Sequence, residues 1–250
     1  MCNAMAYTGV NVLLLWHAAQ ERGFARNEWM TFNQARDIGA KVRKGSKGTM
    51  CIVFSMIERA AKNDIKGGSD GDDMVPMIKP FWLFNVADID GLVERSDSFL
   101  DEFQSVEEGE FILKSSGAHI EHGGNRAFYA QTADLIHLPQ PQQFKRPADY
   151  CATALHELIH WTGHESRLSR NFSKRFGDEA YAFEELVAEL GSAFVLAELN
   201  LVDHTIEDHA RYMQSWLKVL KNDKTAIFTA AKHASAAHAL VMSHCNEIAA

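Results

Sequence analysis

The chain has 250 residues, of which 46% are apolar and 23% are charged, so we expect a soluble globular protein with one large domain or two modest ones. Its formal net charge of −8 argues against wholesale binding of nucleic acid. The four cysteines are scattered without a CxxC pair, which argues against a disulfide framework and predicts a reducing, cytoplasmic location.

Start and stop signals predict two helices near the N-terminus. The first covers residues 11–22 and ends before Gly23, a residue that commonly terminates helices. The second starts at Thr31, which forms the S/T-x-x-Q pattern of a capping box with Gln34. Gly39 is expected to end this short helix.

Two strands and a polar loop are predicted next. The strands cover residues 50–54 and 81–84, and the Gly- and Asp-rich loop covers residues 63–74. A polar stretch at residues 94–98 marks the expected domain boundary. We therefore divide the chain into domains of residues 1–95 and 96–250.

The second domain is predicted to be mainly helical. It begins with a helix, followed by a pair of short strands around residues 131–133. Helices are then expected over the HExxH segment, over YAFEELVAELGSAFVLAEL, around Tyr212, Trp216 and Leu220, and over the alanine-rich C-terminus. The whole chain is accordingly predicted to have an α+β fold.

His156, Glu157 and His160 form an HExxH motif, which is typical of metallopeptidases. Two histidines four residues apart lie on one face of a helix and can bind the same zinc ion. The glutamate between them can act as general base for the water that the metal activates. Apolar residues before and within the motif predict that the back of this helix is buried.

A catalytic zinc needs a third protein ligand, and several residues compete for that position. In HExxHxxGxxH peptidases it is a histidine, but Ser166 stands there and His164 comes two residues early. A second helix offers Glu185, with Glu184 as its nearest rival. We favour Glu185, with Glu189 one turn later holding the Nδ1–H of a ligating histidine.

Residues 20–48 carry seven basic residues against three acidic ones, in a chain that is otherwise acidic. Single-strand binders combine cations for the phosphates with aromatic rings on which bases stack. The candidate DNA-binding residues are Arg26, Trp29, Arg36, Lys41, Arg43, Lys44 and Lys47. On the residues alone, a solvated basic turn beside a core Trp29 explains the pattern equally well.

The chain resembles ArdC-type antirestriction proteins and the N-terminal regions of plasmid TraC primases. The segments that carry the resemblance are TGVNVLLLW, WMTFNQARDIGAKVRKGSKG, FNVADIDGL, HELIHWTGHESRL and FEELVAELGSAF. They occur in this order over nearly the whole chain, which is far more specific than HExxH alone. One departure is Cys151, which stands where an aromatic residue is usual in such proteins.

The resemblance implies a small N-terminal α+β domain that binds single-stranded DNA, followed by a zincin-like metallopeptidase domain. The implied role is to protect incoming plasmid DNA from host restriction. Zinc is the default ion for two imidazoles and a carboxylate, with manganese or cobalt able to replace it. No membrane partner is expected, because the apolar run at residues 12–16 is too short to span a bilayer.

Three hypotheses compete. In the first, the protein binds single-stranded DNA and also holds a metal. In the second, it is a cytosolic zinc metallopeptidase that acts on a protein substrate, without a DNA role. In the third, it is a DNA-binding protein whose metal is structural. A protein substrate or a restriction enzyme is therefore the possible protein partner.

Overall fold

The structure is a computed structural model that describes residues 7–58, 74–92, 102–170, 179–199, 201, 223 and 225–248. The chain divides into two compact units. The first unit comprises Met1–Tyr7 and Asn11–Arg95, and the second comprises Thr8–Val10 and Ser96–Ala250. Both units combine helices with short sheets, so the predicted α+β fold is confirmed.

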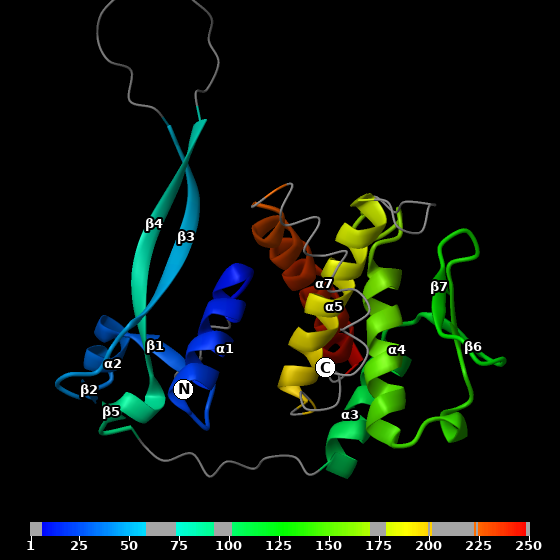
Figure 1. The fold of residues 1–250 in the computed structure, drawn as a ribbon, viewed down its shortest axis with the longest axis horizontal. Helices are drawn as coiled ribbons and strands as arrows, with labels where there is room; N and C mark the ends of the chain where they lie inside the picture. The colour runs from blue at the N-terminus through cyan, green and yellow to red at the C-terminus, as the bar shows by residue number, and fades with distance from the viewer. Residues whose placement is uncertain are drawn as a thin grey trace, which may run out of the picture. The chain divides into compact units, whose positions relative to one another are not determined.

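A three-stranded antiparallel sheet in the order β1-β4-β3 forms the centre of the first unit (Figure 1). Its strands are β1 (Trp29–Thr31), β3 (Thr49–Glu58) and β4 (Met74–Asn85). β3 and β4 pair continuously, from Thr49 opposite Leu83 to Glu58 opposite Met74. Both strands extend well beyond the predicted residues 50–54 and 81–84, because each stabilises the other through pairing that a local pattern does not reveal.

One face of this sheet packs against α1 (Val10–Arg22), whose start and end agree with the predicted helix. The buried residues of this core are Leu15, Ala18, Ala19, Trp29, Cys51 and Leu83. The Asn11 side chain also binds the backbone of Ile52, accepting from its N–H at 2.9 Å and donating to its carbonyl at 2.8 Å. This amide therefore satisfies two backbone groups of the edge strand β3.

The other face of the sheet is covered in part by α2 (Phe32–Asp37). The predicted capping box is confirmed: Gln34 N–H donates to Thr31 Oγ1 at 3.1 Å, and Thr31 N–H donates to Gln34 Oε1 at 2.7 Å. Gly39 follows the helix with φ 79°, a conformation that favours glycine. A small two-stranded sheet then forms between β2 (Lys41–Val42) and β5 (Ile89–Asp90), with a 3₁₀ turn over Val86–Asp88.

The second unit begins with α3 (Glu102–Ser115) and a three-stranded sheet in the order β6-β8-β7. Its strands are β6 (His119–His122), β7 (Phe128–Ala130) and β8 (Leu135–Leu138). β8 runs parallel to β6 and antiparallel to β7. The short strands expected around residues 131–133 are present as β7 and β8, which flank this turn. Beyond the sheet, a 3₁₀ turn over Pro141–Gln143 leads to the next helix.

Three long helices lie side by side in this unit (Figure 1). They are α4 (Pro147–Thr162), α5 (Glu179–Glu198) and α7 (Ala226–Ile248). α4 contacts α5 closely at Gly191, where an added Cβ would lie 2.8 Å from Cγ2 of Ile159. A side chain at this position would push the two helices apart.

None of the helices described is long and apolar enough to cross a membrane. Several predictions fall outside the residues that the structure describes. They are the loop at residues 63–73, the boundary at residues 94–98 and the helix with Tyr212, Trp216 and Leu220.

Candidate metal centre

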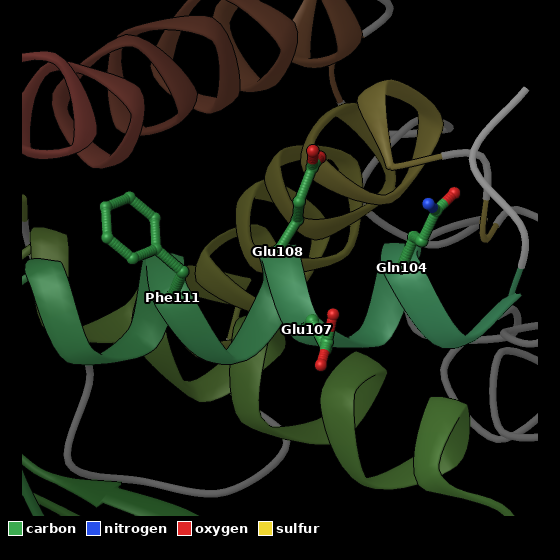
Figure 2. Close-up of a pocket in the computed structure, with 4 residues that line it drawn as sticks. All are labelled: Gln104, Glu107, Glu108 and Phe111. Carbon is green, nitrogen blue, oxygen red and sulfur yellow. The ribbon is translucent and has the colours of Figure 1, made fainter. Parts of the chain in front are cut away.

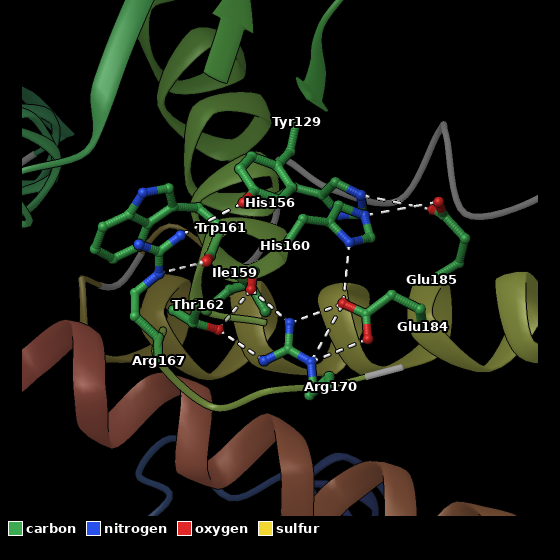
Figure 3. Close-up of polar contacts among 10 residues, drawn as sticks. All are labelled: Tyr129, His156, Ile159, His160, Trp161, Thr162, Arg167, Arg170, Glu184 and Glu185. Carbon is green, nitrogen blue, oxygen red and sulfur yellow. Dashed lines mark hydrogen bonds and ion pairs between the residues drawn. The ribbon is translucent and has the colours of Figure 1, made fainter. Parts of the chain in front are cut away.

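α4 carries both histidines of the HExxH motif. The helix begins with Pro147, which suits a first turn because its missing N–H has no partner there, and it ends at Gly163. Leu155, Leu158 and Ile159 are 0–1% exposed and fix the helix against the core. With its back face fixed in this way, α4 turns His156 and His160 toward α5 (Figure 3).

Glu185 on α5 faces both histidines. Its Oε2 lies 3.7 Å from Nε2 of His156, and its Oε1 lies 3.6 Å from Nε2 of His160. One ligand atom from each of these three residues can be chosen so that all lie within 4.8 Å of one another. In a tetrahedral zinc site, bonds of roughly 2.1 Å place ligand atoms about 3.4 Å apart. The three residues therefore fit a divalent ion with little movement.

Glu184, the rival candidate for third ligand, faces away from this cluster. Its Oε1 lies 3.2 Å from Nδ1 of His160, on the opposite side of the ring from Glu185. Arg170 donates to both of its carboxylate oxygens, and also to Thr162 Oγ1 and to the Ile159 carbonyl, each at 2.7 Å. Glu184 is thus placed to orient the His160 ring rather than to bind the same ion.

Glu189 lies beside the other histidine, as the spacing on α5 predicts. Its Oε2 is 4.0 Å from Nδ1 of His156, which is an ion-pair distance and too long for a hydrogen bond. Each histidine therefore has a separate carboxylate on its Nδ1 side. The two contacts differ in strength, since Glu184 is within hydrogen-bond distance of His160 and Glu189 is not within that distance of His156.

Glu157 is buried, with 8% of its surface exposed, and it is not part of the three-residue cluster. Burial lowers the pKa of His156, but its contact with the Glu185 carboxylate and the negative charges of Glu157, Glu189 and Glu185 outweigh burial and raise this pKa to about 9. Burial likewise raises the pKa of Glu185, and its contacts with His156, His160 and Tyr181 lower it below the ordinary value. The centre is thus rich in negative charge and attracts a cation.

His164 lies outside the cluster. α4 ends at Gly163, and the Nδ1 atom of His164 pairs with Ser166 Oγ at 2.8 Å. Arg167 covers this turn: its guanidinium stacks 3.8 Å from the Trp161 ring and binds Asp134, which also accepts from Tyr129. Figure 3 shows Arg167, Trp161 and Tyr129 beside the histidines.

A shallow hollow on the surface of α3 is separate from this centre. It is lined by Gln104, Glu107, Glu108 and Phe111, which all project from one helix (Figure 2). The lining contains no histidine or cysteine and no residue from a second element. It therefore offers no convergent set of groups for a ligand.

The predicted DNA-binding cations lie in the first unit, and several of them are paired. Arg26 bonds Glu28 at 2.6 Å, Arg36 lies 3.3 Å from Asp37, and Arg43 bonds Asp90 at 2.8 Å. The side chains of Lys41, Lys44 and Lys47 are exposed. The structure thus brings three lysines to the surface and engages the arginines with neighbouring carboxylates.

Trp29 does not fit the stacking role expected of it. Its ring is only 6% exposed, meets Phe24 edge to face, and donates its indole N–H to Asn27 at 2.7 Å. A ring enclosed in this way presents no free face to a base. The exposed tryptophan of the same sheet is Trp82, which sequence reasoning placed in a strand without a role because every residue from 81 to 84 is apolar.

Arg170 is the residue of the centre that sequence reasoning missed. It belongs to a loop, where neither periodicity nor a motif predicts burial. Backbone hydrogen bonds fold this loop back onto the end of α4, and Ser169 adopts φ 47° to allow the reversal. This path brings the Arg170 guanidinium to Glu184 and to the end of α4.

Comparison with known protein families divides the chain in a similar way. Residues 107–233 match the family described as zincin-like metallopeptidase. Residues 1–84 match the family described as the N-terminal domain of anti-restriction factor ArdC. The resemblance expected from the motifs is confirmed.

Solved structures of the antirestriction ArdC protein from plasmid R388 are similar to this chain. The metal-free structure has a TM-score of 0.80 and 38% identity, covering 98% of this chain and 88% of that one. The Mn(II)-bound structure has a TM-score of 0.75 at 38% identity, covering 96% and 85%.

Two sequence relatives extend the comparison. The uncharacterized protein y4eC of Sinorhizobium fredii is 38% identical over 236 residues, which is 94% of this chain and 77% of that protein. The DNA primase TraC of Escherichia coli is 42% identical over 249 residues, or 95% of this chain. The match covers 17% of the length of that primase.

Proposed function

We propose that this chain, which belongs to the family of ArdC-type antirestriction proteins, holds a divalent ion through His156, His160 and Glu185. The observation that carries the proposal is the convergence of their three ligand atoms within 4.8 Å on two packed helices. The Glu184 carboxylate, 3.2 Å from Nδ1 of His160, supports it, because such contacts orient metal-binding imidazoles.

Zinc is the ion that this donor set prefers, and manganese is the ion found in one structure of the R388 relative. An ion held here supplies a Lewis acid that polarises a carbonyl group and makes water more acidic. We infer that Glu157, which is buried and precedes the two-residue spacer to His160, accepts the proton of a water that attacks such a carbonyl. The chemistry that fits these residues is hydrolysis of a peptide bond.

We further propose that the first unit binds single-stranded DNA, and that this binding protects plasmid DNA as it enters a new host. The exposed lysines Lys41, Lys44 and Lys47 support phosphate contacts. Relatives named antirestriction protein and DNA primase agree with a role on DNA. A cytoplasmic location follows from this function.

Two measurements test the proposal. Elemental analysis should find about one divalent ion per chain, lost in His156→Ala and in Glu185→Ala. His164→Ala is the matched control and should retain it, because His164 lies outside the cluster. Retention of the ion in Glu185→Ala and its loss in His164→Ala would overturn the proposed ligand set.

The DNA role is tested by titrating a labelled single-stranded oligonucleotide at increasing salt. Phosphate contacts release counterions, so the affinity should fall steeply with salt concentration. A protein that binds the metal but not DNA would favour the second candidate, a metallopeptidase that acts on a protein substrate alone. Protection of a transferred plasmid against restriction in cells then measures the biological function directly.

A further inference from the structure

We propose that bases of single-stranded DNA stack on a surface formed by the exposed ring of Trp82 and the basic turn beside it. The basic turn comprises residues 41–48. The inference rests on the single-strand binding proposed above and assigns it to one face of the β1-β4-β3 sheet. It replaces Trp29 with Trp82 as the aromatic platform.

The surface is the part of this sheet face that α2 leaves uncovered. Trp82 is 53% exposed, and its cross-strand partner Met50 is 54% exposed. Ile78, four residues before Trp82 on the same face of β4, is 59% exposed. Toward β1 the same face is covered, because Phe84 packs into the small core under α2. We call Met50, Ile78 and Trp82 the Trp82 face.

The opposite face of the sheet is buried at the positions next to Trp82 and Met50. Residues of the opposite face, such as Cys51 and Leu83, are 0% exposed against α1. A large aromatic ring left in water does not contribute the free energy that its burial would add to folding. An exposed apolar patch therefore commonly marks a binding surface. The indole of Trp82 also has no ring contact or hydrogen bond among the described residues.

The basic turn lies directly beside this ring. A Cβ placed on Gly48 would lie 3.1 Å from Cβ and 3.2 Å from Cδ1 of Trp82, so the backbone at Gly48 contacts the base of the indole side chain. Lys47 is the preceding residue, and its carbonyl accepts from Nη1 of Arg22 at 2.7 Å, which ties the turn to α1. The stacking ring is therefore in contact with the turn that carries the cations.

The cations of this turn remain available for phosphates. Lys44 and Lys47 are exposed, and neither forms an ion pair with any residue in the described part of the chain. Charge is also divided unevenly along the chain: residues 1–95 carry 12 Lys and Arg against 11 Asp and Glu, while residues 96–250 carry 13 against 22. A polyanion is therefore repelled by the second unit and accepted at the turn.

A single strand suits this arrangement better than a duplex. A base can stack on a fixed ring only when it is free of its neighbours in a helix. Sequence-tolerant stacking is also what a protein needs when it must bind plasmid DNA of any sequence. We therefore expect the ring of Trp82 to set the affinity with little effect on its salt dependence. The two lysines should instead set how steeply the affinity falls with salt.

The test measures binding of a labelled single-stranded oligonucleotide to the full chain by fluorescence anisotropy. Trp82→Leu keeps apolar bulk but removes the aromatic face, and should weaken binding about 5- to 150-fold with little change in the salt dependence. Trp82→Phe keeps a stacking face and should lose much less. Lys44→Gln with Lys47→Gln should instead flatten the salt dependence, by about 0.7 in slope for each lost phosphate contact.

Phe228→Ala is the matched control, because Phe228 is an exposed aromatic residue, at 45%, in the second unit. It should bind DNA as the unaltered protein does. Circular dichroism and thermal unfolding establish that each variant is folded, and the exposure of Trp82 makes its replacement mild. If Trp82→Leu did not fold, loss of affinity in Met50→Ala, its cross-strand neighbour, would support the same surface.

The outcomes separate the two proposals. If the unaltered protein bound no single-stranded DNA, both the proposed DNA function and this inference would fail. If it bound DNA and the folded Trp82→Leu protein bound equally well, the inference alone would fail. An equal affinity for duplex and single strands would also overturn it, because stacking on Trp82 requires an unpaired base.

Discussion

Arg170 holds Glu184 by both carboxylate oxygens, with Nη2 2.7 Å from Oε1 and Nε 3.0 Å from Oε2. Their side chains are 3% and 5% exposed. Burial raises the pKa of Glu184, but its contacts with His160 and Arg170 lower it below the ordinary value. With the proton on Nδ1, His160 donates to this carboxylate and turns the lone pair of Nε2 toward Glu185.

Removing the arginine alone should destabilise the protein. Arg170→Met leaves the Glu184 carboxylate buried without its counter-charge, and breaking such a pair costs about 3–5 kcal/mol. Urea unfolding of the metal-free protein measures this loss. The double variant Arg170→Met with Glu184→Gln should recover much of it, because neither member of this pair then carries a buried charge.

Removing the Glu184 carboxylate should also weaken metal binding. Groups that orient a ligating histidine typically contribute about 10- to 100-fold to metal affinity. Competition with a coloured chelator should show this loss for Glu184→Ala, whereas Asp37→Asn, a change in the other unit, should bind metal as the unaltered protein does. An unchanged affinity in folded Glu184→Ala would mean that Glu184 does not position His160.

Gly191 offers a test of how helix packing sets the centre. Gly191→Ala places a methyl group against buried Ile159, and overpacking of this kind costs about 1–3 kcal/mol. The gain in helix propensity is only about 1 kcal/mol, so we expect net destabilisation. The helices would separate near Glu185, and metal affinity should fall as well.

A double-mutant cycle provides the control. Ile159→Ala removes the atoms that the new methyl group would meet. In that background Gly191→Ala should cost less than it does alone, which appears as a favourable coupling in urea unfolding. Strict additivity of the two changes would contradict a direct contact between α4 and α5 at this point.

Part of this centre could be predicted from the sequence. The i, i+4 spacing of the histidines and the apolar back of α4 are local properties of one helix. The choice between Glu184 and Glu185 is different, because neighbouring residues on a helix point about 100° apart. Which of them faces the histidines depends on the rotation of α5, and contacts such as that of Gly191 with Ile159 set this rotation.

The two tryptophans of the first sheet show a similar limit to what the sequence can predict. Trp29 stands among basic residues, and this composition alone favoured it for DNA binding. Trp82 stands in a uniformly apolar strand, where period-two alternation cannot reveal which face is open. Only the packing of α1 against the Leu83 face makes Trp29 a core residue and leaves Trp82 exposed.

Asp134 gives a prediction for acid stability. Hydrogen bonds from Arg167 and Tyr129 lower the pKa of Asp134 below its ordinary value of 3.8, although burial opposes this. Because the folded-state pKa is the lower one, the carboxylate stabilises the fold above about pH 3.8, and this contribution is lost as the pH falls through the folded-state pKa. Acidification should therefore reduce stability through this residue.

Asp134→Asn isolates the effect, and asparagine tolerates the φ of 49° found at this position. The unaltered protein should unfold at higher urea concentration than the variant at neutral pH. The difference in unfolding free energy between them should shrink as the pH falls below about 4. A difference that stays constant into strong acid would show that the Asp134 carboxylate does not contribute through its charge.

Glu157→Gln separates hydrolysis from DNA protection. The amide keeps the size and shape of the buried side chain but cannot accept the proton of an attacking water, so any peptidase activity should fall by a factor on the order of 10²–10⁴. Metal content should survive, since Glu157 is not part of the ligand cluster. DNA affinity should survive too, because the proposed DNA-binding surface belongs to the first unit.

The deciding measurement for Glu157→Gln is protection of a transferred plasmid in restricting cells. We expect the variant to retain most of its protection, because binding and covering DNA need no proton transfer. The double variant with Trp82→Leu should lose protection in parallel with its DNA affinity. If a folded Glu157→Gln protein that holds metal and binds DNA gave no protection, cleavage of a protein substrate would instead be the means by which this chain counters restriction.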